Sequence, residues 1–141
     1  MADNEARPCP FCAPGTDRVV AANDLAFAVR DAFPVTPLHS LVIPRRHVAD
    51  CFDLTPGELE ACAELLHQLR DGILGEDPAV LGFNVGVNAG EVAGQGVFHC
   101  HFHLMPRRRG DVPNPKGGVR NLMPRQGHPR AEVCPYGGTP D

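Results

Sequence analysis

The stretch of this sequence that decides the fold is residues 97–105, which read VFHCHFHLM. Three histidines alternate with other side chains in it, at His99, His101 and His103. Because a β-strand has a side-chain period of two, the pattern predicts a strand over residues 97–105 with all three imidazoles on one face, about 6.6 Å apart. The opposite face carries side chains that are predicted to enter the core: Phe98, Cys100, Phe102 and Leu104.

The row of histidines has three interpretations. It is a polar strand face that is rich in histidine by chance, a metal site, or a nucleophilic histidine between neighbours that bind the charge of a substrate. Three of the seven histidines of the chain fall within residues 99–103, which argues against chance. The other two interpretations both use imidazole chemistry, because a neutral ring nitrogen either ligates a metal or attacks an electrophile.

Short apolar runs outside this stretch predict further strands. Residues 18–22 and 25–30 are separated by Asn23-Asp24, a hairpin signal, and residues 40–44 (SLVIP) read as a strand that its proline ends. Residues 82–88 alternate as a strand does and lead into the glycine-rich loop 89–96.

One helix is clear. Thr55 is a good N-cap, Pro56 suits the first helical position, and Glu58 completes a capping box. Gly75 is the expected end of the helix. An apolar stripe is predicted from residues that recur at intervals of three and four: Leu59, Cys62, Leu66, Leu69 and Ile73.

These elements predict an α+β fold, a mostly antiparallel sheet with one main helix on it. The chain has 141 residues, enough for one domain. We expect a frayed N-terminus over residues 1–8, the domain proper over residues 9–106, and an extension rich in Pro, Gly and Arg over residues 107–141 with a short strand near residues 119–123.

Composition limits the classes of function. The net charge is −4, which argues against a general nucleic-acid binder, although residues 107–141 hold seven Lys and Arg against three Asp and Glu. No apolar run reaches the roughly 20 residues of a membrane helix, and residues 1–7 have no signal-peptide character. We therefore expect a cytoplasmic protein that binds neither nucleic acid nor membrane.

Cys9 and Cys12 form a Cys-x-x-Cys pair. In a cytoplasmic chain such a pair is a metal knuckle, a redox pair or two unliganded cysteines. No parallel βαβ pattern surrounds it, which argues against the redox pair. Zinc takes four ligands, and His47 and His99 could complete a set of two cysteines and two histidines.

The histidine row resembles the signature of the histidine-triad (HIT) family of nucleotidyl hydrolases and transferases. Residues 31–34 (DAFP), His39 and residues 41–47 (LVIPRRH) are similar to the upstream block of that family, and Asn88 to Gln95 resembles the loop that leads into the triad. The resemblance covers about residues 9–106. It implies a five-stranded antiparallel sheet and a homodimer.

The resemblance also implies a role for each matching residue. His101 is the nucleophile, which attacks the α-phosphorus of an adenine nucleotide and becomes a nucleotidyl-histidine. His103 contacts the α-phosphate and His39 supports the triad from behind. Asp31 would accept hydrogen bonds from the ribose hydroxyls, and Asn88 and Gln95 would hold phosphate oxygens or the leaving group.

Zinc-containing members of the family carry a similar knuckle. The resemblance implies one structural zinc per chain, held by Cys9, Cys12, His47 and His99. Relatives often have Ser or Thr where this chain has Gly96, which leaves the choice of leaving group open.

The expected function is therefore hydrolysis of dinucleoside polyphosphates or adenosine phosphoramidates at the α-phosphate. The alternatives are a zinc-stabilised nucleotide sensor with little turnover and a metallohydrolase that uses the three histidines as ligands.

Overall fold

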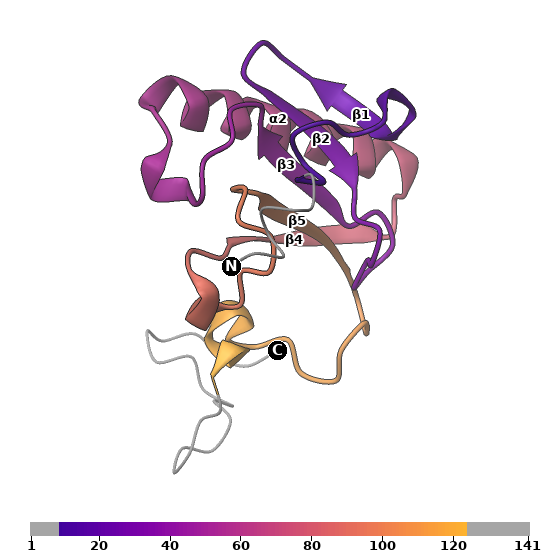
Figure 1. Ribbon diagram of the computed structural model, residues 1–141. Coiled ribbons are helices and arrows are strands. Elements are labelled where there is room, and N and C mark those ends of the chain that lie inside the picture. The colour runs from indigo at the N-terminus through magenta and orange to yellow at the C-terminus, as the bar shows by residue number, and fades with distance from the viewer. Residues whose placement is uncertain (1–8, 124–141) are drawn as a thin grey trace.

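A five-stranded antiparallel sheet and one long helix build the protein, as predicted (Figure 1). The computed structural model describes residues 9–123, so the predicted frayed segment 1–8 and the end of the predicted extension lie outside the described residues. Neighbouring strands follow the order β1-β2-β3-β5-β4. The strands are β1 (Val19–Ala22), β2 (Ala26–Arg30), β3 (Ser40–Pro44), β4 (Val80–Val87) and β5 (Phe102–Arg108).

The sheet has two different faces. Helix α2 (Pro56–Glu76) crosses one of them and packs on β2 and β3 (Figure 1). Because side chains alternate along a strand, the core under the helix takes Ala26, Ala28 and Val42, while their neighbours form a second apolar cluster on the other face. The second cluster consists of Phe27, Val29, Leu41 and Ile43.

The first hairpin forms as its sequence predicts. β1 pairs antiparallel with β2, and the Asn23 side chain accepts hydrogen bonds from the backbone N–H groups of Leu25 (3.2 Å) and Ala26 (2.9 Å) across the turn. Asn favours such turns because its side chain bonds the backbone two residues on. Residues 40–44 form β3 as predicted, with Pro44 as its last residue.

Helix α2 begins as predicted, with both hydrogen bonds of the Thr55–Glu58 capping box present. It ends at Glu76, one residue beyond the predicted Gly75. The predicted stripe is partly wrong, because Leu59 is 51% exposed. The face that packs on the sheet is rotated toward residues the stripe left out, Ala61 and Leu65.

Replacing Glu58 with glutamine is expected to destabilise the fold by roughly 1.5–3 kcal/mol, the usual worth of a hydrogen bond to a charged group. Both carboxylate oxygens of the buried Glu58 accept hydrogen bonds from the Arg46 guanidinium, at 2.7 and 3.0 Å. These bonds and one from the Thr55 backbone hold the pKa of Glu58 at about 2, below its ordinary value of 4.5. The carboxylate therefore stabilises the folded state above pH 4.5 and loses that contribution as pH falls toward 2.

Urea unfolding of the wild type and of Glu58→Gln at pH 7 and at pH 3 checks this. The difference between the two proteins is expected to shrink at the lower pH. The matched control is Glu60→Gln, which changes an exposed carboxylate in the same helix turn. A difference that stays constant with pH would contradict the assignment.

The chain after β5 does not form the predicted strand near residues 119–123. A short 3-10 helix, η4 (Gly118–Leu122), takes its place. Gly117 precedes it with φ 89°, a left-handed conformation that breaks the extended backbone a strand needs. Three further 3-10 turns are η1 (Thr16–Arg18), η2 (Cys51–Asp53) and η3 (Glu91–Ala93).

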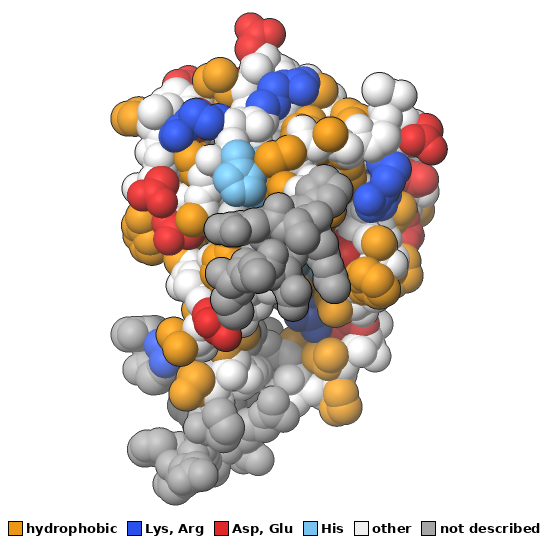
Figure 2. All heavy atoms as spheres, viewed as in Figure 1, with side chains coloured by type: hydrophobic (Ala, Val, Ile, Leu, Met, Phe, Trp, Pro, Cys, Tyr) orange, Lys and Arg blue, Asp and Glu red, His pale blue; other side chains and the backbone are white. Residues whose placement is uncertain are grey.

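Charges of both signs are mixed on the surface. Figure 2 shows acidic and basic side chains interspersed with hydrophobic ones over the face in view. Several arginines are paired: Arg107 donates to both carboxylate oxygens of Asp111 at 2.8 Å, and Arg108 donates to Asp77. Among residues 9–123, no helix is long and apolar enough to cross a bilayer.

Candidate functional site: a histidine row split between two clusters

The predicted strand over residues 97–105 is wrong in its first half. β5 begins at Phe102, so only His103 lies in the strand, while His101 immediately precedes it and His99 lies in a bend. β3 pairs with β5 only from Phe102 to Leu104, and the Cys100 N–H instead donates to the Val48 carbonyl (2.8 Å). The backbone therefore leaves the sheet and points His99 in a different direction from its neighbours.

Of the four side chains predicted to alternate with the histidines and enter the core, three do so. Cys100, Phe102 and Leu104 are buried in the core under the helix. Phe98 is 40% exposed, and its predicted burial is wrong because it lies in the irregular segment before the strand. The buried residues anchor the back of the segment, so His103 faces the side of the sheet that carries the second apolar cluster.

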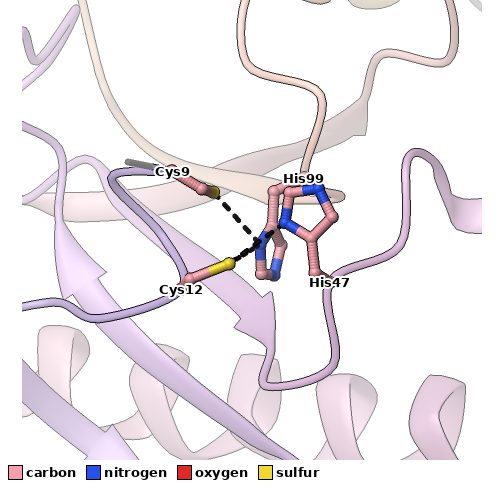
Figure 3. A group of neighbouring side chains, drawn as sticks. All are labelled: Cys9, Cys12, His47 and His99. Atoms are coloured by element: carbon pink, nitrogen blue, oxygen red, sulfur yellow. Dashed lines mark hydrogen bonds between the residues drawn. The ribbon is translucent and has the colours of Figure 1, made fainter. Parts of the chain in front are cut away.

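His99 joins a cluster with Cys9, Cys12 and His47 (Figure 3). Their ligand atoms all lie within 4.8 Å of one another. His99 Nδ1 lies 3.4 Å from Cys9 Sγ and 3.6 Å from Cys12 Sγ, and His47 Nδ1 lies 3.1 Å from Cys12 Sγ. A tetrahedral zinc with bonds of about 2.0–2.3 Å separates neighbouring sulfur and nitrogen ligands by roughly 3.5 Å, so the spacing fits zinc.

The orientation of the His99 ring also suits a metal ligand. His99 is fully buried, and its Nε2–H donates to the Pro44 carbonyl (2.7 Å). The proton is therefore on Nε2, and the lone pair of Nδ1 points at the thiols. Burial lowers the pKa of His99, which favours the neutral ring that a metal requires. A hydrogen bond from the ring nitrogen that does not bind the metal is how proteins commonly orient a ligating histidine.

His103 belongs to a different group of side chains. Its Nδ1 lies 2.9 Å from Nε2 of the buried His39, whose own Nδ1 accepts a hydrogen bond from the Val35 N–H (3.1 Å). Because a backbone N–H can only donate, the proton of the neutral His39 ring is on Nε2 and is donated to His103. The proton of a neutral His103 is then on Nε2, where it is available as a donor.

His101 has the opposite tautomer. Its Nδ1 lies 2.9 Å from the carbonyl oxygen of His99, and a carbonyl can only accept, so Nδ1 carries the proton. Nε2 of a neutral His101 therefore holds a free lone pair. The rings of His101 and His103 are neighbours, with centroids 5.2 Å apart. A ring with a free lone pair on Nε2 thus lies next to a ring that carries an Nε2–H.

Asp31 lies beside the second group. Its Oδ2 is 3.4 Å from His39 Nε2 and 4.0 Å from His103 Nδ1, while Oδ1 accepts a hydrogen bond from the Phe33 N–H (2.8 Å). Asp31, His39 and His103 are close enough for a metal. A metal on His39 Nε2 would put the ring proton on Nδ1, against the Val35 N–H, so the hydrogen-bonded arrangement suits this group better.

The three histidines of the row do not converge on one metal. Among residues 9–123, the two groups with converging donor atoms contain His99 and His103 separately, and neither contains His101. The geometry therefore does not favour the metallohydrolase. It separates a cluster that can bind zinc from a pair of rings that can attack and stabilise a phosphate.

The loop of residues 89–96 brings Gln95 inside the protein. Gln95 is 4% exposed, accepts from the Gly90 N–H (2.9 Å) and donates to the carbonyls of Ala49 and Val97. The amide thus holds the loop together, and its predicted contact with a phosphate stays a prediction. Asn88 follows β4 directly, one position beyond the pair Val87–Phe102, which places it next to His101 across the strands.

Sequence reasoning missed three groups in this site. The Val35 N–H and the His99 carbonyl fix two tautomers, and the Phe11 ring contacts His101 with centroids 5.0 Å apart. Backbone groups carry no sequence signal. Phe11 lies between Cys9 and Cys12, which were predicted to meet His99, and this position in the sequence could have indicated that its ring lies near the three histidines.

The rings of His39 and His103 are expected to protonate below the ordinary histidine value of 6.5. Burial lowers the pKa of both, and the Asp31 carboxylate opposes the shift only in part. Because the unfolded chain binds these protons more readily, stability is full above pH 6.5 and declines as pH falls below it. A pH titration followed by nitrogen NMR of the imidazoles checks whether the two pKa values lie below 6.5. Protonation of His39 at or above 6.5 would contradict it.

Comparison with known proteins gives three consistent likenesses. Residues 15–110 match the family model described as HIT domain. An uncharacterized HIT-like protein of Mycoplasma genitalium is 36% identical over 112 residues, 76% of this chain and 78% of that protein. The AP-4-A phosphorylase of Mycobacterium tuberculosis is 40% identical over 97 residues, 67% of this chain and 48% of that enzyme.

Solved structures agree with this. The crystal structure of a zinc-bound histidine triad family protein from Mycobacterium smegmatis superposes with a TM-score of 0.66. It is 31% identical and covers 73% of this chain and 77% of that one.

Proposed function

Because the chain belongs to the HIT family of nucleotide hydrolases and transferases, we propose that it cleaves adenine nucleotides at the α-phosphate through a nucleotidyl-histidine. The observation that carries the proposal is the pair of tautomers: a free lone pair on His101 Nε2 beside an N–H on His103 Nε2. A nucleophile and a donor for the phosphate oxygens are the two groups that this displacement needs.

In the first step the lone pair of His101 Nε2 forms a bond to the α-phosphorus. The bond from that phosphorus to the leaving group breaks, and the leaving group departs with the electron pair, as a polyphosphate anion or, after taking a proton from solvent, as an amine. The Nε2–H of His103 donates to a phosphate oxygen, where negative charge is concentrated. The His99 carbonyl accepts from His101 Nδ1–H and stabilises the positive charge that the ring gains on attack.

In the second step water attacks the same phosphorus and the P–N bond breaks. His101 recovers its lone pair, and the products are a nucleoside monophosphate and a proton. His39 is a positioning residue, because it holds His103 through Nε2–H and is itself fixed by the Val35 N–H. We assign Asp31 to the ribose hydroxyls and Asn88 to a phosphate, as the family pattern implies.

Zinc is the metal that the cluster of two cysteines and two histidines fits, and we propose one per chain. A bound zinc would supply structural stability, since all four ligand positions are taken by side chains. Reduced thiolates are needed there, which supports a cytoplasmic location. We further propose a homodimer, because β4 is an edge strand and leaves Val85 48% exposed for a second copy.

A substrate panel with product identification tests the proposal. Dinucleoside tetraphosphate, dinucleoside triphosphate and adenosine phosphoramidate are each incubated with the protein, with and without inorganic phosphate. The relative named AP-4-A phosphorylase supports the tetraphosphate as substrate and phosphate as an acceptor. Release of AMP or of a phosphorolysis product is the expected result. Tight AMP binding without turnover of any of the three would favour the sensor instead.

A further inference from the structure

Phe11 is the residue through which the Cys9–Cys12 knuckle contacts His101, the proposed nucleophile. It lies between Cys9 and Cys12, where the Cys12 N–H donates to the Cys9 carbonyl (3.3 Å) and closes a turn. The edge-on contact of its ring with His101 has centroids 5.0 Å apart and an interplanar angle of 65°. A second edge-on contact, with His99, has centroids 6.1 Å apart.

The other side of Phe11 rests on the sheet. The ring packs against the second apolar cluster, that of Phe27, Val29, Leu41 and Ile43. The Phe11 side chain is therefore supported by the second apolar cluster, and it lies in the chain between two cysteines of the group that can bind zinc. A ring fixed in this way is a wall for the half-buried His101 imidazole beside it.

We propose that Phe11 is a positioning residue that holds the His101 imidazole in the orientation in which Nδ1–H bonds to the His99 carbonyl. This inference rests on the proposed function, because the orientation matters only if Nε2 attacks. The hydrogen bond fixes one atom of the ring but leaves rotation about it free. The Phe11 ring, packed against the imidazole, restricts that rotation, so the contact favours one rotamer while the hydrogen bond selects the tautomer.

The consequence is a selective effect on the chemical step. If the wall is removed, the imidazole samples other rotamers, and in some of them the Nδ1–H bond is lost and Nε2 carries the proton. The fraction of protein with a free lone pair aimed at the phosphorus falls. We expect metal binding and substrate affinity to stay as they are, because the proposed metal ligands and phosphate contacts come from other side chains.

Two replacements separate the ring edge from simple packing. Phe11→Leu keeps an apolar side chain on the cluster but has no aromatic edge, and Phe11→Tyr keeps the edge. The control is Phe52→Ala, which removes a phenylalanine that is 85% exposed. For each protein the measurements are bound metal, substrate dissociation constant, single-turnover rate of adduct formation, and nitrogen NMR of the His101 ring.

In Phe11→Leu the rate of adduct formation is expected to fall about 2- to 13-fold, the equivalent of one edge-to-face aromatic pair. The His101 nitrogen signals shift toward a mixture of tautomers, while metal content and substrate affinity are unchanged. Phe11→Tyr restores the wild-type rate and signals, and Phe52→Ala never loses them.

Three outcomes would overturn the inference. One is a wild-type rate and wild-type nitrogen signals in Phe11→Leu, which would leave the proposed function intact. Another is loss of metal from Phe11→Leu, because the ring would then hold the knuckle and not the nucleophile. If the wild type forms no adduct with any substrate, the proposed function fails; unchanged His101 signals in Phe11→Leu would then overturn the positioning role as well.

Discussion

Replacing His101 with alanine is expected to abolish the covalent intermediate and to lower turnover by about 10³-fold or more, because the nucleophile is lost while substrate binding remains. The wild type incubated with a slowly hydrolysed nucleotide should gain the mass of one nucleotidyl group in intact-mass spectrometry. His101→Ala should gain none. Since His101 is only half-buried and makes one side-chain hydrogen bond, the variant should keep its fold.

The matched control is His67→Ala. His67 is exposed on α2, and within residues 9–123 its ring bonds only to the backbone carbonyl of Ala63, so its loss should change neither the adduct nor turnover. Circular dichroism of all three proteins shows whether the fold is intact. An adduct that persists in His101→Ala would refute the assignment of the nucleophile and, with it, the proposed mechanism.

Removal of the metal is expected to have the largest effect on stability. Cys12→Ala should purify without zinc and unfold at a lower urea concentration, with a loss of several kcal/mol, since structural zinc contributes roughly 10–16 kcal/mol in isolated zinc-finger peptides. The reason is geometric: the four ligand atoms come from the N-terminal knuckle, from His47 after β3, and from His99 before β5. A metal there links three separate segments of the chain.

Metal analysis and urea unfolding of the purified proteins measure this effect. Cys51→Ala is the control, because Cys51 is a partly buried thiol outside the cluster and loses only packing. His99→Ala and His103→Ala test which of the two histidines is a zinc ligand. The first should lose zinc and stability, and the second should keep its zinc. Equal midpoints of urea unfolding and equal zinc content in these two variants would contradict the assignment of His99 as a ligand.

Much of the fold was predictable because the signals that specify it are local. The Asn23 turn, the Thr55–Glu58 capping box and the apolar run of β3 each act within a few residues of one another. The sequence pattern also predicted the two histidines that complete a set with Cys9 and Cys12, and the structure brings all four together.

The errors fall where long-range contacts decide. Alternation alone predicted a strand from Val97, but the bond from Cys100 to Val48 takes the backbone out of the sheet before Phe102. The predicted buried face of α2 was wrong for the same reason, because packing on the sheet, and not the spacing of apolar residues, selects which side of the helix is buried. Leu59 satisfies the spacing and is nevertheless exposed.

The chain's own pattern of residues was sufficient to specify an antiparallel sheet with one helix, and to mark the imidazoles and thiols that carry the chemistry. It could not assign a proton to any ring. The tautomers of His99, His101 and His103 depend on the Pro44 carbonyl, the His99 carbonyl and the chain from Val35 through His39. Only folding brings these partners within hydrogen-bond distance, and a neutral imidazole takes its role from the partner it meets.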